Sequence, residues 1–348
     1  MEQRKVLITG ANGFIGRFLT EEAVRRGYEV WAGVRNTSSI DHLPKEKVNR
    51  IDLNYSSPEA LSGIIGQHVR QHGAWDYVIH NAGLTKTNRP PDFFEVNAEN
   101  TQRLLMALSK TDCCPKKFLL MSSLATFSAG NSKTLEPIRL DDPQKPDTIY
   151  GQSKLLAEQY VRAQDAFPYM ILRPTGVYGP GDKDYLIEIE SIRAGFDFAA
   201  GMKPQYITFI YVKDLATVTF QALENNPLFE GGKGDVVHEN KAIWNREYFV
   251  SDGDVYTDTQ FARLIQEIIQ KKRVFRVRIP LGLVYFVCLC SEWIGRITGK
   301  PSTLNTDKYK ILKQRNWICD TEPLRRDLGF IPAYNLRTGL EETISTVY

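Results

Sequence analysis

Cysteine is scarce in this chain, and the few cysteines present form no recognisable cluster. The 348 residues contain five cysteines, an odd number, and none of them stands in a C-x-x-C pair. Such a set predicts neither a disulfide framework nor a zinc site. We therefore expect no metal centre and a reducing, cytoplasmic setting.

An excess of charge of either sign is also missing. Lys and Arg together number 44 and Asp and Glu 41, which leaves a formal net charge of +3. A balance this close to neutral provides no broad positive field for binding nucleic acid. The sequence also shows no internal repeat, no low-complexity linker and no apolar signal segment ahead of its first predicted strand. We therefore expect neither secretion nor a nucleic-acid partner.

No apolar run is long enough to cross a membrane. The longest is residues 281–297, which follow a basic run at 271–278, whereas a span needs about 20 apolar residues. Three interpretations stay open: core of a small C-terminal domain, which we prefer, the lining of an apolar substrate pocket, or a helix lying on a membrane surface. The length and the apolar fraction of 42% suit two domains or one enlarged α/β unit.

The first stretch of the chain predicts a phosphate cradle. Residues 5–9 are a short apolar run typical of a buried strand, and a G-x-x-G-x-x-G pattern follows without a spacer. Apolar residues at helical spacing then predict a helix ending near Gly27. Glycine lets the backbone approach a pyrophosphate closely, and the free N–H groups of the first helical turn face the phosphates. The predicted nucleotide-binding residues of this turn are Gly10, Asn12, Gly13, Phe14, Ile15 and Gly16.

Strand and helix patterns alternate after this turn, which predicts an α/β fold with a Rossmann-type, doubly wound parallel sheet. Further strands are expected at 28–34, 48–53, 75–83 and 116–121, and helices at 58–72, 93–110 and 149–164. We expect residues 1–172 to form the nucleotide-binding domain, with returning segments near 206–252. Residues 173–348, mainly 174–205 and 253–335, are expected to form a smaller C-terminal substrate-binding domain.

The end of the second predicted strand bears on the choice of nucleotide. Arg35 stands where an acidic side chain would select the free 2′-hydroxyl of NAD. A guanidinium pairs with a 2′-phosphate instead, so the sequence favours NADP, with NAD possible; the alternative is a solvated surface arginine. His80, at the end of a later strand, is interpreted as a core residue. The other predicted contacts to the nucleotide are Asp52, Leu53, Asn81, Ala82 and Gly83.

The chemistry is predicted at Tyr150 and Lys154. In a helix over 149–164 these residues lie one turn apart on the same face. A free phenol has a pKa of about 10, and a neighbouring ammonium lowers it by favouring the phenolate. The tyrosine can then exchange a proton with a substrate oxygen while hydride moves between substrate and nicotinamide. Residues 128–147, a long loop just before this helix, are expected to border the substrate.

Taken in this order, the Gly10–Gly16 turn, Asp52-Leu53, Ser123, Tyr150-x-x-x-Lys154 and residues 172–180 resemble the extended branch of the short-chain dehydrogenase/reductase superfamily, the epimerase/dehydratase group. The resemblance covers essentially the whole chain. It implies that Ser123 holds the substrate oxygen, with Ser122 as the alternative, and that Asn97 supports the active-site water and lysine. It also implies that Pro174 borders the cofactor and that two copies pair through the helices carrying Asn97 and Tyr150.

Departures from the family pattern indicate the branch. Ile207 stands where nucleotide-sugar members carry an arginine that grips the substrate diphosphate, and Leu124 and Ala125 stand where 4,6-dehydratases carry an acidic pair. Residues 172–174 instead resemble hydroxysteroid dehydrogenases and dihydroflavonol reductases. Residues 279–331 resemble the tail of 3β-hydroxysteroid dehydrogenases and sterol decarboxylase-type members. The expected function is therefore the interconversion of a secondary alcohol and a ketone on a bulky apolar small molecule, steroid-like, terpenoid-like or flavonoid-like.

Two other functions stay open. One is a nucleotide-sugar epimerase with tightly bound NAD, in which Arg173, Lys183 or Arg193 would replace the missing anchor for the diphosphate. The other is a non-catalytic nucleotide-sensing protein, which the intact Ser, Tyr and Lys set disfavours.

Overall fold

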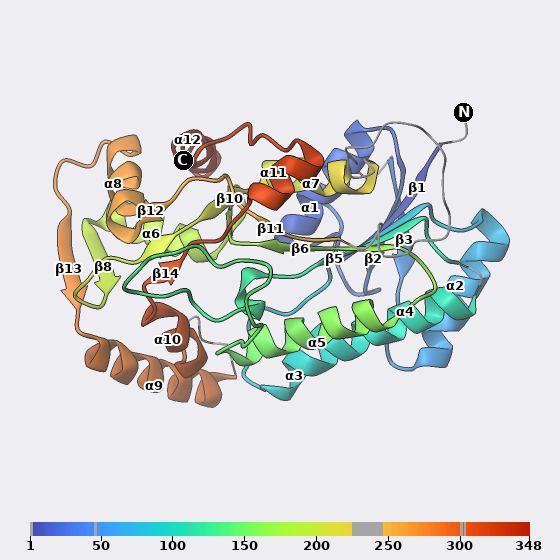
Figure 1. Ribbon diagram of the computed structural model, residues 1–348, viewed down its shortest axis with the longest axis horizontal. Helices are drawn as coiled ribbons and strands as arrows, with labels where there is room; N and C mark the ends of the chain where they lie inside the picture. Colours follow the sequence, from blue (N-terminus) through green and yellow to red (C-terminus); the bar gives the residue numbers. More distant parts are fainter. Residues whose placement is uncertain (1–2, 45–46, 112, 225–245, 300–301, 303) are drawn as a thin grey trace.

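A seven-stranded parallel sheet in the order β11-β6-β5-β4-β1-β2-β3 forms the centre of the molecule (Figure 1). The computed structural model describes residues 3–44, 47–111, 113–224, 246–299, 302 and 304–348, which we call the described residues. The strands are β1 (Lys5–Thr9), β2 (Glu29–Val34), β3 (Val48–Asp52), β4 (Tyr77–His80), β5 (Lys117–Met121), β6 (Tyr169–Pro174) and β11 (Arg246–Val250). This strand order confirms the predicted doubly wound fold.

Helices cover both faces of this sheet, as Figure 1 shows. One face packs against α1 (Phe14–Arg25), α7 (Val212–Glu224) and α11 (Glu322–Leu328). The other packs against α2 (Pro58–His72), α4 (Asn100–Lys110) and α5 (Ile149–Ala163). Val6 and Ile8 belong to the first cluster and Leu7 to the second, because successive side chains of a strand point to opposite faces. The inner strands are buried on both sides, which is why they read as continuous apolar runs, whereas the edge strand β3 exposes Asn49, Arg50 and Asp52.

The helix predicted over 93–110 is interrupted. It begins as α3 (Pro91–Phe94), passes through a π-helical segment, Glu95–Glu99, and continues as α4. A single π turn of this kind inserts one residue into the helix and is common at functional sites. Asn97 lies in the middle of this segment.

The C-terminal part is built from small sheets and short helices at the left of Figure 1. Its strands are β7 (Gly176–Tyr178), β8 (Phe196–Ala200), β9 (Tyr206–Ile207), β10 (Phe209–Tyr211), β12 (Tyr256–Thr257), β13 (Phe275–Ile279) and β14 (Asn316–Trp317). Its helices are α6 (Asp184–Ala194), α8 (Asp258–Ile268), α9 (Leu281–Thr298), α10 (Thr306–Leu312) and α12 (Leu336–Ser345). Its core holds Ile189, Phe209, Phe261 and Leu340. Of the returning segment expected near 206–252, residues 225–245 lie outside the described residues.

The preferred interpretation of residues 281–297 as core is wrong. They form α9, in which Val284, Cys288 and Gly295 are the buried positions, and most of the apolar side chains point outward. The expectation that this run is too short to cross a membrane is also wrong: among the described residues, α9 is the one helix whose 18 residues are long and apolar enough to cross one by length and composition.

Candidate active site

The predicted site residues gather at the carboxyl edge of the central sheet. The glycine turn follows β1, Arg35 follows β2, residues 81–83 follow β4 and Ser123 comes two residues after β5. Asp52 and Pro174 are the last residues of β3 and β6. In a doubly wound sheet this edge, near the point where strand order reverses, is where ligands bind.

The glycine turn leaves no room for side chains at two positions. Gly10 has φ of +66°, and a Cβ there would lie 2.8 Å from Cα of Ala82. A Cβ on Gly16 would overlap the carbonyl oxygen of Gly10. Gly13 is the residue that precedes α1, and no described side chain caps that helix. The first N–H groups of α1, from Phe14 and Ile15, therefore remain available to donate hydrogen bonds to phosphate oxygens, and the turn fits a dinucleotide.

The adenosine end of this cradle carries two guanidinium groups. Arg35 is exposed directly after β2, and Nη2 of Arg50 donates to its carbonyl oxygen at 2.8 Å. Asp52 is exposed beside Val34, its partner in β2. Leu53 is buried under Gly33, and the Asn12 backbone belongs to the glycine turn. Sequence reasoning missed Arg50, since an arginine within a strand carries no motif.

A chain of hydrogen bonds joins the loop after β4 to the π-helical segment. The Ala82 N–H donates to Thr9 Oγ1 at 3.0 Å, and Thr9 Oγ1 lies 2.8 Å from His80 Nδ1. His80 Nε2 lies 2.9 Å from Thr101 Oγ1, whose hydroxyl donates to the Asn97 carbonyl. Because that hydroxyl proton is already used, His80 Nε2 carries the ring proton and Nδ1 accepts from Thr9. Burial lowers the pKa of His80 to about 3, so this histidine is a neutral core group, as predicted.

Asn97 holds the same loop from the other side. Its Oδ1 accepts from the Leu84 N–H at 2.7 Å, and its Nδ2 donates to the Leu84 carbonyl and to Ser153 Oγ. A Cβ on Gly83 would lie 3.2 Å from Asn97 Oδ1 and 3.9 Å from Lys154 Nζ. Glycine at 83 therefore lets Asn97 and Lys154 approach the nucleotide side of the loop together. Asn81 Nδ2 adds a longer bond to the Gly10 carbonyl, 3.4 Å.

The start of α5 is positioned by groups that sequence reasoning missed. Thr148 caps the helix by accepting from the Gly151 N–H. A Cβ on Gly151 would overlap the Ala125 carbonyl oxygen, so glycine beside Tyr150 lets α5 approach the turn that follows Ser123. Both carboxylate oxygens of Asp307, from α10, lie 3.1 Å from the Ile149 nitrogen. The glycine beside the predicted tyrosine was a usable signal, but nothing in the sequence indicated Asp307.

Ser123, Tyr150 and Lys154 are brought together, but their electrostatics differ from the prediction. Burial raises the pKa of Tyr150, and a hydrogen bond with the Ser123 side chain opposes this rise. Lys154 Nζ donates to the Met121 carbonyl at 2.6 Å, and burial lowers the pKa of Lys154 to about 8. The predicted lowering of the Tyr150 pKa is therefore wrong for this structure, because burial dominates and Lys154 is directed to a backbone carbonyl.

Ser122 and Arg173 belong to a buried ionic network instead of the reaction site. Ser122 Oγ donates to Glu158 at 2.5 Å, and Arg173 binds both carboxylate oxygens of Glu158 at 2.8 Å. Arg173 also pairs with Glu247 and is only 1% exposed. The alternative that Ser122 holds the substrate oxygen is therefore wrong, because its hydroxyl is already engaged. Arg173 as a replacement anchor for a diphosphate is excluded for the same reason.

Two further predicted regions have contacts of their own. The loop 128–147 is tied to the C-terminal segment: Ile138 forms a bridge with Cys319, and Asn316 Nδ2 donates to the carbonyls of Asn131 and Glu136. Pro174 is buried and paired with Val250.

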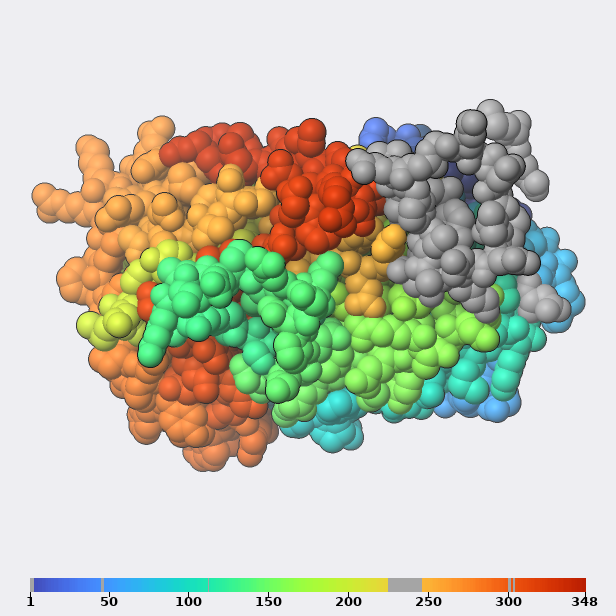
Figure 2. Space-filling view, in the orientation of Figure 1, coloured from blue at the N-terminus to red at the C-terminus, as the bar shows by residue number. Residues whose placement is uncertain are grey.

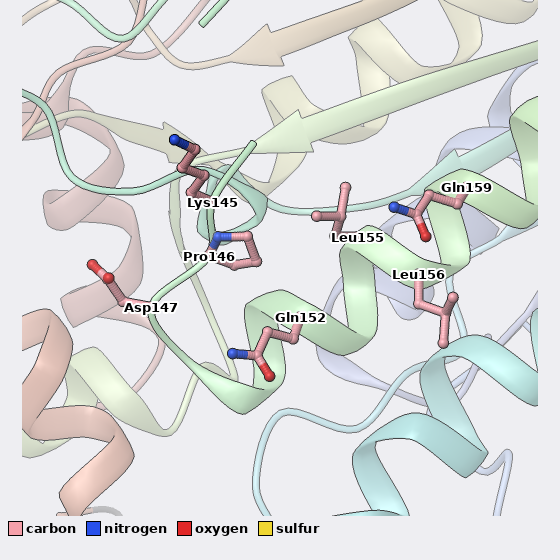
Figure 3. Close-up of a pocket in the computed structure, with 7 residues that line it drawn as sticks. All are labelled: Lys145, Pro146, Asp147, Gln152, Leu155, Leu156 and Gln159. Carbon is pink, nitrogen blue, oxygen red and sulfur yellow. The ribbon is translucent and has the colours of Figure 1, made fainter. Parts of the chain in front are cut away.

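A hollow of about 470 Å³ lies on the outward side of α5 (Figure 3). Its lining comes from the end of the loop 128–147 and from α5: Lys145, Pro146, Asp147, Gln152, Leu155, Leu156 and Gln159. The buried side of α5 carries Ser153, Lys154 and Glu158 instead. This hollow is therefore separate from the predicted catalytic residues.

Comparison with known proteins agrees with this geometry. Residues 6–235 match the NAD dependent epimerase/dehydratase family. The chain is 24% identical to 3-beta-hydroxysteroid dehydrogenase of Mycolicibacterium neoaurum, over 98% of this chain and 90% of that one. It is 22% identical to N-acetyl-alpha-D-glucosaminyl-diphospho-ditrans,octacis-undecaprenol 4-epimerase of Escherichia coli O157:H7, over 97% and 94%.

Solved structures share the fold. UDP-glucose 4-epimerase with UDP-glucose from Thermotoga maritima aligns with a TM-score of 0.73 and 22% identity, covering 99% of this chain and 98% of that one. The matched family, the strand order and the glycine turn lead to one conclusion. The chain belongs to the NAD-dependent epimerase/dehydratase family, the extended short-chain dehydrogenases/reductases, and is an NAD(P)-dependent oxidoreductase.

Proposed function

We propose that this enzyme interconverts a secondary alcohol and a ketone on a bulky apolar molecule such as a 3-hydroxysteroid, or a related terpenoid or flavonoid. The observation that carries the proposal is the grouping of Ser123, Tyr150 and Lys154 beside the loop that contacts the glycine turn. The nicotinamide nucleotide, when bound, supplies or accepts the hydride.

Each side chain has a role in this proposal. The Ser123 hydroxyl donates a hydrogen bond to the substrate oxygen, and Tyr150 transfers a proton to or from that oxygen. Lys154, protonated below about pH 8, supplies a positive charge that favours the Tyr150 phenolate as the proton leaves. Asn97 acts through its bonds to Leu84 and Ser153, which hold the loop and α5 in register.

The surroundings favour an apolar substrate over a nucleotide sugar. Ile207, at the position of the expected arginine, pairs with Trp317 in the small sheet and cannot neutralise a diphosphate. Arg193 stacks on the Tyr348 ring at 4.0 Å. Leu124 and Ala125 form a short 3-10 turn and provide no acid for dehydration. Phe93 contacts the Tyr150 ring edge to face, with 6.1 Å between ring centroids.

Replacement of Tyr150 tests the mechanism. Tyr150→Phe removes the proton donor, so kcat should fall by about 10²- to 10⁴-fold, while NADP binding measured by calorimetry stays close to that of the wild type. Tyr160→Phe, on the same helix but bound to Glu99, is the matched control and should keep its turnover. Turnover retained in Tyr150→Phe would refute the proposed acid/base role.

The substrate class is tested by a screen that follows nicotinamide absorbance. Steroid alcohols and ketones should give stoichiometric consumption of nucleotide, because an oxidoreductase ends with altered cofactor. A nucleotide-sugar epimerase returns its hydride, so UDP- and dTDP-sugars converted without net consumption would favour that function instead.

The proposed preference for NADP rests on Arg35, directly after β2, and on Arg50 in β3, whose Nη2 donates to the Arg35 carbonyl. Arg35→Asp should shift the ratio of kcat/KM for NADPH over NADH towards NADH by about tenfold, which corresponds to about 1.4 kcal/mol. Arg325→Asp, an exposed arginine on α11, is the charge-matched control. An unchanged ratio in Arg35→Asp would show that Arg35 is only a surface charge.

A further inference from the structure

The C-terminal part of the fold carries, at the end away from the central sheet, an apolar surface made of α9 and the two-stranded β8–β13 ribbon. On α9, Phe286 is 61% exposed and Trp293 66% exposed. The other outward apolar side chains of α9 are Leu283, Tyr285, Val287, Leu289, Ile294 and Ile297. Single exposed apolar residues are ordinary, but a contiguous patch indicates contact with a partner. We call this surface the α9 face.

Two polar side chains of α9, Ser291 and Glu292, contact the neighbouring segment instead. Glu292 accepts from both the N–H and the hydroxyl of Thr306, and Ser291 lies 2.5 Å from Ser302, oxygen to oxygen. A helix on the surface of a water-soluble domain normally turns its polar side outward. In α9 that order is inverted, so the outward side is suited to an apolar environment.

The ribbon shows the same inversion. In β8 and β13 the outward positions include Phe198, 52% exposed, and Phe275, 68% exposed. The alternate positions of the ribbon carry charge and are paired: Arg276 with Asp197 at 3.2 Å, and Arg278 with Asp258 at 3.0 Å. The last residue of β13 is Ile279, and α9 begins at Leu281, so the two elements form one continuous end of the molecule (Figures 1 and 2).

The charge next to this face is positive. Residues 271–278 contain five Lys or Arg and no Asp or Glu. Lys272 and Arg273 are exposed. The Arg296 side chain at the far end of α9 is 68% exposed and pairs with Glu292 at 2.6 Å. Aromatic and aliphatic side chains flanked by basic residues are the composition that binds the surface of an anionic bilayer.

We propose that the α9 face docks on a bilayer that contains anionic lipid, with α9 lying along the surface. Val284, Cys288 and Gly295 pack against the protein, so α9 keeps one side on the enzyme and does not cross the bilayer. Aromatic side chains such as Trp293 suit the boundary between headgroups and acyl chains.

This docking places the bilayer beside the candidate active site. Asn88, in the loop after Leu84, donates to the Gly295 carbonyl at 3.1 Å. The helix α10, which packs on α9, supplies Asp307 to the start of α5, next to Tyr150. Provided that the proposed function holds, we expect the substrate to be a lipid taken up from this bilayer.

The docking is tested with vesicles and purified protein, without nucleotide or substrate, so the result does not depend on the proposed function. The wild type should co-sediment with vesicles of phosphatidylcholine and phosphatidylserine, and less with phosphatidylcholine alone or at high salt. The double variant Phe286→Glu/Trp293→Glu should lower binding at least about tenfold. Lys272→Gln/Arg273→Gln should lower only the part of binding that depends on phosphatidylserine.

Ile331→Glu, which changes another exposed apolar residue in the loop between α11 and α12, is the matched control and should bind like the wild type. Thermal unfolding and NADP binding confirm that each variant is folded. Absence of vesicle binding by the wild type, or unchanged binding by the double variant, would overturn the proposal. So would resistance of the membrane-bound protein to alkaline carbonate, which indicates a spanning helix. A concentration-dependent dimer that the double variant abolishes, without vesicle binding, would assign the face to a second copy instead.

Discussion

The helices α5 and α9 both direct polar side chains towards the protein, but they differ in what those side chains contact and in what faces outward. In α5, Lys154 and Glu158 are buried and bound to a backbone carbonyl and to Arg173. In α9, Glu292 caps a neighbouring helix and stays partly exposed. The outward side of α5 carries Gln152 and Gln159, whereas that of α9 is apolar.

The difference shows how an inward polar group should be interpreted. Charge is costly to bury, so a buried and fully paired charge indicates a catalytic or organising role, as at Lys154 and Glu158. In α9 the informative side is the outer one, because its apolar surface has no cover among the described residues. The buried polar side chains of α5 therefore mark the candidate active site and the ionic network behind it. The exposed apolar side chains of α9 mark the surface that we propose docks on a bilayer.

The largest expected effect comes from breaking the network in α5. Glu158→Gln leaves the buried Arg173 guanidinium without its main counter-charge, so the free energy of unfolding should fall by about 3–5 kcal/mol. Glu292→Gln in α9, where the ion pair with Arg296 is exposed, should cost about 1 kcal/mol or less. Urea denaturation of the two variants measures both. Equal losses of unfolding free energy in the two variants would show that Glu158 and Glu292 contribute equally to stability, which would contradict this prediction.

Acid should destabilise the central sheet through His80, the last residue of β4, and should leave the α9 face unaffected. The folded pKa of His80 is about 3, below its unfolded value of 6.5, so its contribution to stability is complete above pH 6.5 and is lost as the pH falls towards 3. Between these two pKa values the contribution of His80 to the free energy of unfolding should fall by about 1.4 kcal/mol for each pH unit. His68, with a pKa of about 4 that burial lowers, adds to the same slope.

Urea unfolding at a series of pH values measures this slope. His80→Asn should flatten it, since asparagine does not titrate. His42→Asn, at an exposed site, is the control and should leave it unchanged. An unaltered slope in His80→Asn would contradict the assignment of His80 as a neutral core residue.

Local pattern determined much of this protein. The glycine turn, the alternating elements and the spacing of Tyr150 and Lys154 are short-range features, so sequence alone predicted the doubly wound sheet, the nucleotide cradle and the face shared by Tyr150 and Lys154. Ser123 was selected by resemblance, and the network around Ser122 now supports that choice.

Tertiary structure decided the remaining contacts and electrostatics of the site, because these depend on which distant segments meet and on how deeply each group is buried. The direction of the Tyr150 pKa shift, the Glu158–Arg173 pair and the contact of Asp307 with the start of α5 join residues from separate parts of the chain. The apolar run at 281–297 is compatible with core and with surface as a sequence, and the sequence favoured core. Only the packing of α9 shows which side is outward. The hydrophobic effect favours removing an apolar side chain from water, but it does not specify which surface covers that side chain.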